Sequence, residues 1–277
     1  MPIQTKKIVI DGAELSYIDQ GSGVPLVLVH GSLNDLRTWA LQMGPFSKRY
    51  HTIAISRRYH YPNAFADDGW DYSAINHAED LATFINELDL APAHIVGHSY
   101  GAYACAILTA RHPELIRSSV LCEPPIIPIL GATPEGKSIA SEFMDKIWKP
   151  MEEAFQKGDL KAGIKMFIEG ISGVGTFDKL PSTVRDMIMD NALAMKAQLT
   201  ARDQFPTFTC LDAQRIIVPV LLVSGEKSHK MLHAVLKELE RCLPDRSTAV
   251  IPDASHNMHV ANPQAFNQAV LDFLAEH

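Results

Sequence analysis

Residue types and spacing that suit nucleophilic chemistry occur at residues 97–101, in the segment GHSYG. An apolar run that includes Ile95 and Val96 precedes this segment, and an alanine-rich stretch with helical character follows it. In a sharp turn from a strand to a helix, the serine hydroxyl is lifted clear of the sheet, and only small residues fit two positions before and after it. The spacing therefore predicts that Ser99 is a nucleophile.

Strands and helices that alternate along the chain predict the parallel sheet that would position this serine. Two short strands at Lys7–Ile10 and Glu14–Ile18, joined by Asp11-Gly12, are expected to form an antiparallel edge. The continuous apolar run Pro25–Val29 is typical of a strand that helices cover on both faces. Further strands are predicted at 52–55, 94–96, 118–122, 219–224 and 248–251, and helices at 72–88, 100–111, 229–243 and 263–275.

A helical insertion interrupts this alternation after residue 125. Segments 142–155, 160–169 and 183–199 have helical patterns, and no strand pattern returns until residue 219. We therefore predict one α/β core, residues 1–124 and 211–277, with a helical cap at 125–210. The cap has apolar side chains suited to a pocket roof, although most are expected to pack among the helices; they are Phe143, Trp148, Met151, Phe155, Met166, Phe167, Met187, Met189 and Met195, of which Trp148 is a substrate-binding candidate.

Four motifs resemble those of the α/β-hydrolase superfamily, and the resemblance extends over essentially the whole chain. They are the loop His30-Gly31-Ser32, the turn at 97–101, the strand end Ser224-Gly225-Glu226 and the late pair Ser255-His256. The resemblance implies an α/β-hydrolase fold, with a mostly parallel eight-stranded sheet flanked by helices and an inserted cap. It also implies a serine, acid and histidine in that chain order, with no cofactor and no metal.

His256 is the general base that this resemblance implies. It would take the proton of the Ser99 hydroxyl during attack and return it to the leaving group. His259 is the alternative base, but the superfamily pattern places the histidine directly after the last strand, ahead of a helix that here begins near Pro263.

The acid of the triad departs from the common pattern. In most relatives it lies three residues past the glycine of the penultimate strand's loop, and this position is Ser228, which has no carboxylate. Glu123 follows an earlier core strand, and its location resembles that of the acid in haloalkane dehalogenases and in lactone hydrolases that act on zearalenone. We therefore expect Glu123 to orient His256, with Glu226 and Asp253 as the alternatives.

An oxyanion hole is expected from two backbone N–H groups, those of Ser32 and Tyr100, each worth a few kcal/mol to the transition state. Tyr100 begins the helix after the nucleophile, where the helix dipole adds to the effect. The nearby segment 56–61, SRRYHY, supplies two further substrate-binding candidates, Arg58 and His60. Arg58 falls where relatives often have an arginine that braces neighbouring loops, and bracing is the favoured role for it. A different alternative concerns Glu123, which would be structural if its carboxylate paired with Arg57 or Arg58.

Composition narrows the cellular context. The 277 residues have a formal net charge of −7, which disfavours nucleic acid and anionic membranes as partners. The first 20 residues lack the apolar core of a secretion signal, and we predict a cytoplasmic protein. The cysteines have no C-x-x-C spacing, so buried free thiols are expected rather than a zinc site or a disulfide; they are Cys105, Cys122, Cys210 and Cys242.

Three functions remain open at this point. The leading hypothesis is a serine hydrolase that cleaves a small apolar ester or lactone through an acyl-enzyme, acting alone or as a homodimer. A carbon–carbon bond hydrolase or a cofactor-free perhydrolase would use the same triad. A non-catalytic receptor for a small molecule is the third, since fold alone does not determine function.

Overall fold

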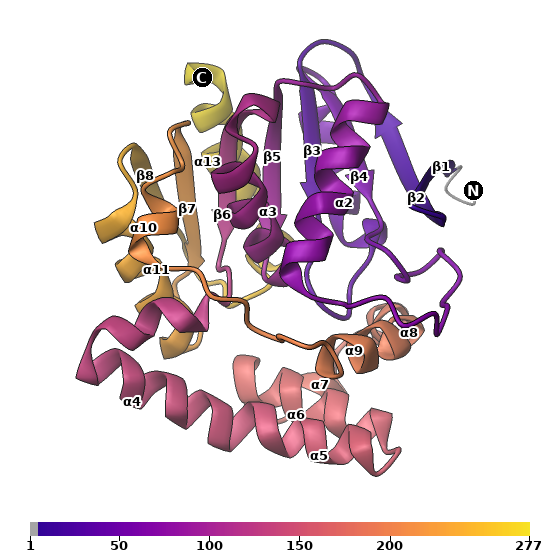
Figure 1. The fold of residues 1–277 in the computed structure, drawn as a ribbon, viewed down its shortest axis with the longest axis vertical. Helices are drawn as coiled ribbons and strands as arrows, with labels where there is room; N and C mark the ends of the chain where they lie inside the picture. Colours follow the sequence, from indigo (N-terminus) through magenta and orange to yellow (C-terminus); the bar gives the residue numbers. More distant parts are fainter. Residues whose placement is uncertain (1–4) are drawn as a thin grey trace.

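An eight-stranded sheet forms the centre of the structure, a computed structural model that describes residues 5–277 (Figure 1). The strand order is β1-β2-β4-β3-β5-β6-β7-β8; β1 and β2 run antiparallel to their neighbours, and β3 to β8 are parallel. This confirms the predicted mostly parallel sheet. The strands are β1 (Lys6–Ile10), β2 (Ala13–Gln20), β3 (Pro25–Val29), β4 (His51–Ile55), β5 (Ala93–His98), β6 (Ile116–Cys122), β7 (Val220–Gly225) and β8 (Arg246–Ile251).

Helices cover both faces of this sheet, which explains why β3 and β5 are buried along almost their whole length rather than at every second residue. Apolar residues of α2, α3 and α11 pack in one core cluster, and those of α1 and α13 pack in another that includes Trp39 and Phe266. Burying each such large side chain contributes about 1.5–3 kcal/mol. The bounds are α1 (Ala40–Phe46), α2 (Ala74–Glu87), α3 (Tyr100–Arg111), α11 (Lys230–Cys242), α12 (Met258–Ala261) and α13 (Pro263–Glu276), with short turns η1 (Leu36–Trp39), η2 (Pro113–Leu115) and η3 (Ile127–Ala132).

The chain between β6 and β7 is helical, and α4 to α9 lie below the ends of the strands in Figure 1. The exact division into a core and a cap at residues 125 and 210 stays a prediction. In residues 5–277, no helix combines the length and apolar character needed to cross a bilayer. The helices here are α4 (Pro134–Phe143), the π-helical η4 (Met144–Trp148), α5 (Lys149–Gln156), α6 (Leu160–Ser172), α7 (Thr176–Lys179), α8 (Ser182–Asp190), α9 (Ala192–Leu199) and α10 (Cys210–Ala213).

Two of these helices differ from their predicted extents because of capping and tertiary contacts. The helix expected at 142–155 begins earlier, at Pro134, since the Thr133 side chain accepts a hydrogen bond from Gly136 N–H and proline suits the first helical position. The helix expected at 183–199 is interrupted at Asn191. The Asn191 amide donates to Asp35 and accepts from Tyr61 N–H, so this side chain joins the helical segment to the core.

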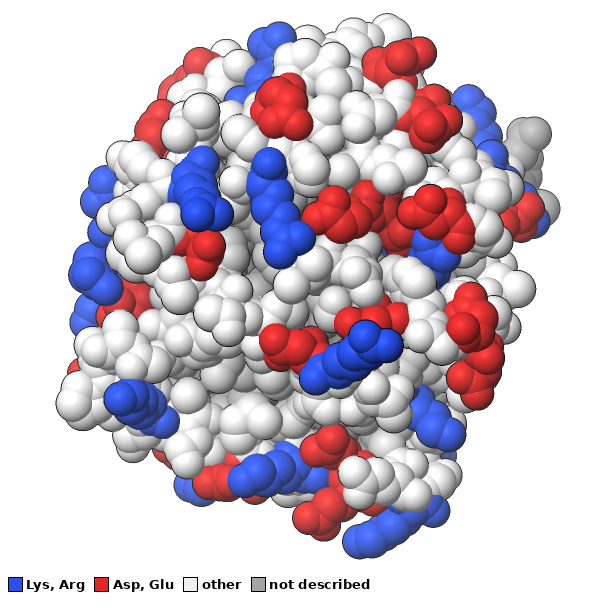
Figure 2. All heavy atoms as spheres, in the orientation of Figure 1, with Lys and Arg blue, Asp and Glu red and all other residues white. Residues whose placement is uncertain are grey.

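Charged side chains are interspersed on the face drawn in Figure 2, and neither sign forms a continuous patch there. Most ion pairs on the surface join exposed groups, such as Lys149 with Asp145. Pairs of this kind contribute little to stability, typically below about 1 kcal/mol.

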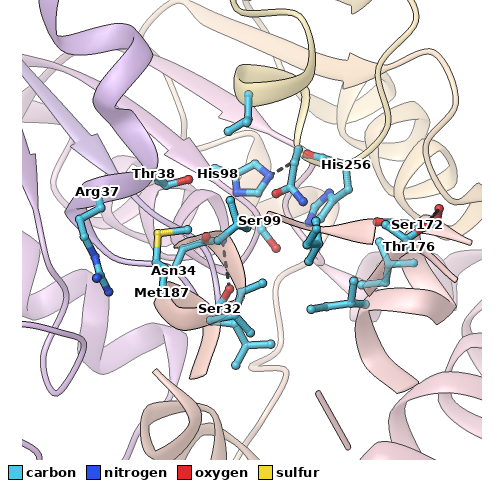
Figure 3. Close-up of a pocket in the computed structure, with 18 of the residues that line it drawn as sticks. Ser32, Asn34, Arg37, Thr38, His98, Ser99, Ser172, Thr176, Met187 and His256 are labelled. Carbon is cyan, nitrogen blue, oxygen red and sulfur yellow. Dashed lines mark hydrogen bonds between the residues drawn. The ribbon is translucent and has the colours of Figure 1, made fainter. Parts of the chain in front are cut away.

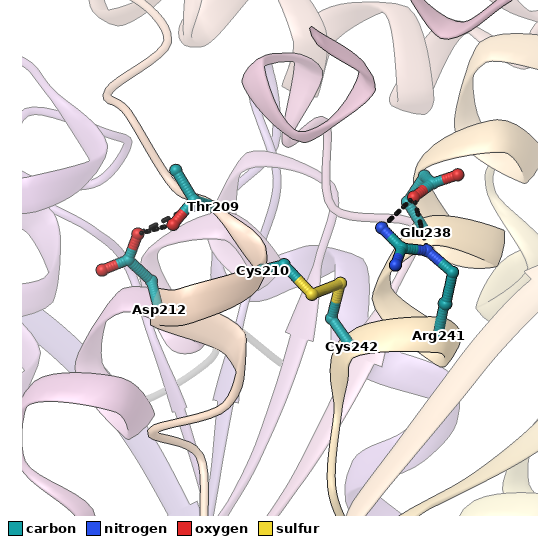
Figure 4. Close-up of a disulfide and its surroundings, with 6 residues drawn as sticks. All are labelled: Thr209, Cys210, Asp212, Glu238, Arg241 and Cys242. Atoms are coloured by element: carbon teal, nitrogen blue, oxygen red, sulfur yellow. Dashed lines mark hydrogen bonds and ion pairs between the residues drawn. A yellow bond between two sulfur atoms is a disulfide. The ribbon is translucent and has the colours of Figure 1, made fainter. Parts of the chain in front are cut away.

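A disulfide joins Cys210 and Cys242, with their Cα atoms 5.1 Å apart (Figure 4). The expectation of four free thiols was therefore wrong for this pair, whereas Cys105 and Cys122 are free and buried. The two bonded residues are 32 positions apart, and they meet because the fold packs α10 against the end of α11. Local spacing alone carries no signal of such a contact.

We expect loss of this disulfide to lower the free energy of unfolding by about 3–4 kcal/mol, the chain-entropy value for a loop of this length. Neither cysteine lines the cavities described below, so activity of the folded protein should be unchanged. Urea unfolding with and without reductant measures the difference. The Cys210→Ser/Cys242→Ser variant is the matched control, because its lower midpoint should not respond to reductant; equal midpoints for oxidised and reduced wild type would contradict the prediction.

Candidate active site

Ser99 occupies a strained turn between β5 and α3, with φ of 54° and ψ of −125°. Hydrogen bonds hold the turn: Ser99 N–H donates to the Cys122 carbonyl at 2.8 Å, and the Ser99 carbonyl accepts from Tyr103 N–H at 3.0 Å. A Cβ at Gly97 would lie 2.6 Å from the Ala102 Cα, and one at Gly101 would overlap the His30 carbonyl. The packing around the turn thus explains both glycines of the GHSYG segment.

Glu123 and His256 form a buried pair. His256 Nδ1 lies 2.6 Å from Glu123 Oε2, and the Glu123 side chain is fully buried. The second carboxylate oxygen, Oε1, accepts from Gly225 N–H at 2.8 Å. With both oxygens bound, the carboxylate has a fixed orientation, and a proton on Nδ1 leaves Nε2 of His256 as the basic nitrogen.

The alternative acids lie elsewhere. The Glu226 carboxylate accepts from Asp253 N–H at 2.9 Å, and the Asp253 carboxylate pairs with exposed Lys227 at 2.7 Å. The structure therefore brings Glu123, and neither of the alternatives, to the His256 ring. Ser228, at the common acid position, has a buried hydroxyl with no partner in the described residues.

Two further histidines lie near His256 but have different partners. His98 Nε2 donates to the His256 carbonyl at 2.8 Å, which fixes the loop that holds the base (Figure 3). His259 Nε2 lies 2.9 Å from the Thr38 hydroxyl, and burial lowers the pKa of His259 to about 3. Unlike His256, His259 does not line the cavity.

The predicted oxyanion donors lie beside Ser99. Tyr100 is the first residue of α3, and the N–H groups of a helix's first turn have no partner within the helix. Gly31, which precedes Ser32, is so close to the nucleophile that a Cβ there would be 2.7 Å from the Ser99 Cβ. The Ser32 side chain donates to Gln198 Oε1 at 2.7 Å.

A cavity of about 520 Å³ opens at Ser99 and His256 (Figure 3). Its wall away from the catalytic groups is mainly apolar, and residues from α6 to α8 supply much of it: Phe167, Ile168, Ile171, Leu180, Val184, Met187 and Ile188. A second cavity of only about 20 Å³ also contacts Ser99 and His256, and its lining includes Trp148, Phe143, Phe205 and Gln198. Ser99 thus faces one large and one very small space.

Arg37 is the one residue with a formal charge in the lining of the large cavity, all of which belongs to the described part of the chain. Its guanidinium binds Asp35 at 2.7 Å and Asp190 at 2.8 Å. Burial lowers the pKa of Arg37, but the hydrogen bonds and negative charges of these two carboxylates outweigh that effect, so its pKa is raised. In Figure 3 it lies on the opposite side of Ser99 from His256.

Arg58 and His60, in the loop after β4, were candidates for substrate binding, but neither residue lines either cavity. Arg58 is buried and binds both oxygens of Asp80, at 2.6 and 2.8 Å, and the Ile10 carbonyl. An arginine neutralised in this way braces the fold, as the favoured alternative proposed. His60 is also buried, with its Nε2 3.3 Å from Arg57 Nη2.

Of the predicted roof residues, Trp148 and Phe143 line the small cavity, Met187 lines the large one, and Phe167 lines both. The others pack internally or face solvent. Sequence reasoning missed Gln198 and Phe205, because residues that converge from separate elements share no local pattern. No group of three or more His, Cys, Asp or Glu side chains in residues 5–277 is arranged to hold a metal ion.

The sequence matches the alpha/beta hydrolase fold family over residues 24–263, and the chain belongs to this family. It is 25% identical to a 2-(acetamidomethylene)succinate hydrolase of Mesorhizobium japonicum, over 98% of this chain and 95% of that one. It is 26% identical to the non-heme chloroperoxidase CPO-A1 of Kitasatospora aureofaciens, over 99% of both. Among solved structures, the enol-lactonase of Burkholderia xenovorans superposes with a TM-score of 0.76 at 21% identity, over 98% of this chain and 100% of that one. The relatives thus include several bond types on one fold.

Proposed function

We propose that this chain is a serine hydrolase that cleaves a neutral, largely apolar carboxylic ester or lactone through an acyl-enzyme. The observation that carries the proposal is the buried Glu123–His256 pair, 2.6 Å between Oε2 and Nδ1, at a cavity shared with the strained Ser99. A structural histidine has no need of a fixed carboxylate on one side and an open cavity on the other. An activated nucleophile needs both.

Each group has a role in the proposed reaction. Ser99 Oγ attacks the substrate carbonyl while His256 Nε2 takes its proton, and Glu123 stabilises the imidazolium that forms. The N–H groups of Ser32 and Tyr100 bind the resulting oxyanion. His256 then returns the proton to the departing alkoxide, which leaves as an alcohol or, from a lactone, stays attached to the acyl chain. Water, deprotonated by His256, releases the acid and restores Ser99.

The character of the cavity supports a neutral substrate. The hydrolase of Mesorhizobium japonicum is named for a succinate derivative, which has two carboxylates. Here the cavity's charged residue, Arg37, already binds two carboxylates of the protein, and the rest of the wall is mainly apolar. Removing Arg37 from Asp35 to bind a substrate carboxylate would leave a buried charge unpaired.

A labelling and substrate experiment tests the proposal. Wild-type protein is expected to react covalently with a fluorophosphonate at Ser99 and to hydrolyse esters or lactones, whereas Ser99→Ala should do neither. Two series of ester substrates, one with longer acyl groups and one with longer alcohol groups, should differ in their rates of hydrolysis. The part of the substrate that faces the cavity of about 20 Å³ should be limited to about one or two carbons. Exclusive turnover of diketones, or peracid formation alone, would replace the ester proposal. Ligand binding without labelling would favour a receptor.

A further inference from the structure

We propose that Arg57 is a positioning residue for the oxyanion hole, because its guanidinium clamps the carbonyls of His30 and Gly31 and thereby orients and polarises the Ser32 N–H. This inference rests on the proposed hydrolase function. Arg57 is adjacent to Arg58 in sequence, but Arg57 binds backbone carbonyls whereas Arg58 binds the carboxylate of Asp80.

The clamp consists of three hydrogen bonds from one residue to the loop after β3. Arg57 Nε donates to the His30 carbonyl at 3.0 Å, and Nη2 donates to the Gly31 carbonyl at 3.1 Å. The Arg57 backbone N–H donates to His30 Nε2 at 2.9 Å. Because this nitrogen accepts, the His30 proton is on Nδ1, which donates to the Gly31 carbonyl at 2.8 Å. The Gly31 carbonyl therefore accepts two hydrogen bonds.

Peptide geometry transmits this clamp to Ser32. The Gly31 carbonyl and the Ser32 N–H belong to one planar trans peptide, so they point in opposite directions. Fixing the carbonyl toward Arg57 directs the N–H away from it. On its other side the loop touches the nucleophile turn, where Gly31 lies against Ser99 and the His30 carbonyl packs on Gly101. The loop is held between Arg57 on one side and the turn on the other, and the Ser32 N–H points away from Arg57.

The charge of Arg57 adds to its geometric effect. Only 2% of the residue is exposed, and its side-chain partners within residues 5–277 are neutral: two carbonyls and the His60 imidazole. Its Nη1 has no hydrogen-bond partner there, and the Tyr100 ring lies 5.5 Å from the guanidinium carbon. Burial lowers the pKa of Arg57, but a guanidinium remains protonated in proteins. A positive charge on the Gly31 carbonyl strengthens the hydrogen bond that Ser32 N–H donates. This gain is largest when the substrate oxygen becomes negative in the transition state.

The experiment compares an ester with its thionoester, in which a sulfur atom replaces the carbonyl oxygen and accepts hydrogen bonds poorly. Arg57→Met is expected to lower kcat on the ester by about 10- to 100-fold, less than the roughly 10²–10³ for loss of a donor itself. KM and the thionoester rate should change much less, so the ester/thionoester rate ratio falls. Arg57→Lys keeps the charge but cannot bind both carbonyls with a fork, and its ratio should lie between those of wild type and Arg57→Met.

Asp80→Asn is the matched control, since it weakens the neighbouring Arg58 pair without touching the loop after β3. It should lower the melting temperature and leave the rate ratio unchanged. Two results would overturn the inference: an equal loss of ester and thionoester activity in Arg57→Met, or a wild-type rate ratio in Arg57→Lys, which cannot bind both carbonyls. Either result would mean that the clamp has no role in the oxyanion hole. The proposed hydrolase function would still stand. A wild-type protein that neither hydrolyses esters nor reacts with fluorophosphonate would remove both.

Discussion

Replacing Glu123 by Gln is expected to reduce kcat on the preferred ester by about 10⁴-fold, with the protein still folded. The amide keeps the shape of the side chain, and its oxygen still accepts from Gly225 N–H. Its NH₂ group, however, faces His256 Nδ1, which favours the wrong tautomer and offers no negative charge to the imidazolium. Ser99→Ala should lose about 10⁶-fold, as expected when a triad nucleophile is removed.

The double variant Ser99→Ala/Glu123→Gln should be no slower than Ser99→Ala, because the groups of a triad act as a unit and their losses are not additive. Glu226→Gln is the matched control on the alternative acid, whose carboxylate contacts the Asp253 N–H rather than His256. Steady-state kinetics on purified, folded proteins decide the outcome. Near-normal turnover by Glu123→Gln together with a large loss in Glu226→Gln would move the acid to the common strand.

Much of this site could be predicted because its parts depend on local sequence. The nucleophile turn needs small residues at 97 and 101, and the parallel strands need apolar residues on both faces, so each leaves a pattern in the chain. The strands β3 and β6 were predicted to within two residues at each end. Glu123 was predicted because its place after β6 resembles that of the acid in haloalkane dehalogenases, and the structure puts its carboxylate against His256.

The parts that sequence did not predict depend on contacts between distant segments. Bracing was the favoured role for Arg58, but its partner Asp80 lies 22 residues away, and no periodicity in the sequence reveals that contact. Cys210 and Cys242 meet only because α10 packs on α11. Asn191 interrupts a sequence with helical spacing because its amide is used by Asp35 and Tyr61 of the core. Tertiary contacts override local preference at each of these places.

Stability is expected to fall steeply as the pH drops below about 6.5, because six buried histidines are held neutral in the folded protein: His30, His60, His77, His94, His98 and His259. Burial lowers the pKa of each, and the Arg57 charge lowers it further for His30, His60 and His77. The unfolded chain, whose histidines have a pKa near 6.5, therefore binds more protons in acid than the folded protein. Stability from these residues is fully present above that pH and is lost below it.

The size of the effect follows from proton linkage. Each histidine that stays neutral on folding costs up to about 1.4 kcal/mol per pH unit below about 6.5, so six give a slope of up to about 8 kcal/mol per unit. A total stability of about 5–15 kcal/mol would be exhausted within roughly one to two pH units. Urea unfolding at pH 8, 7, 6 and 5 measures the slope. Equal stability at pH 8 and pH 5 would show that the histidines are not held neutral.

His77→Phe isolates the contribution of one group. Neither ring nitrogen of His77 has a hydrogen-bond partner in the described residues, and its ring packs among Tyr72, Trp70 and Tyr100. Phenylalanine can occupy this aromatic site without leaving a polar group unpaired, so stability at pH 8 should be retained or increased. Below pH 6.5 the linkage slope should decrease by the share of one proton. Burial and the nearby charge of Arg57 both disfavour a protonated His77 in the folded protein. A slope identical to that of wild type would contradict the prediction, because it would mean that His77 is protonated in the folded protein.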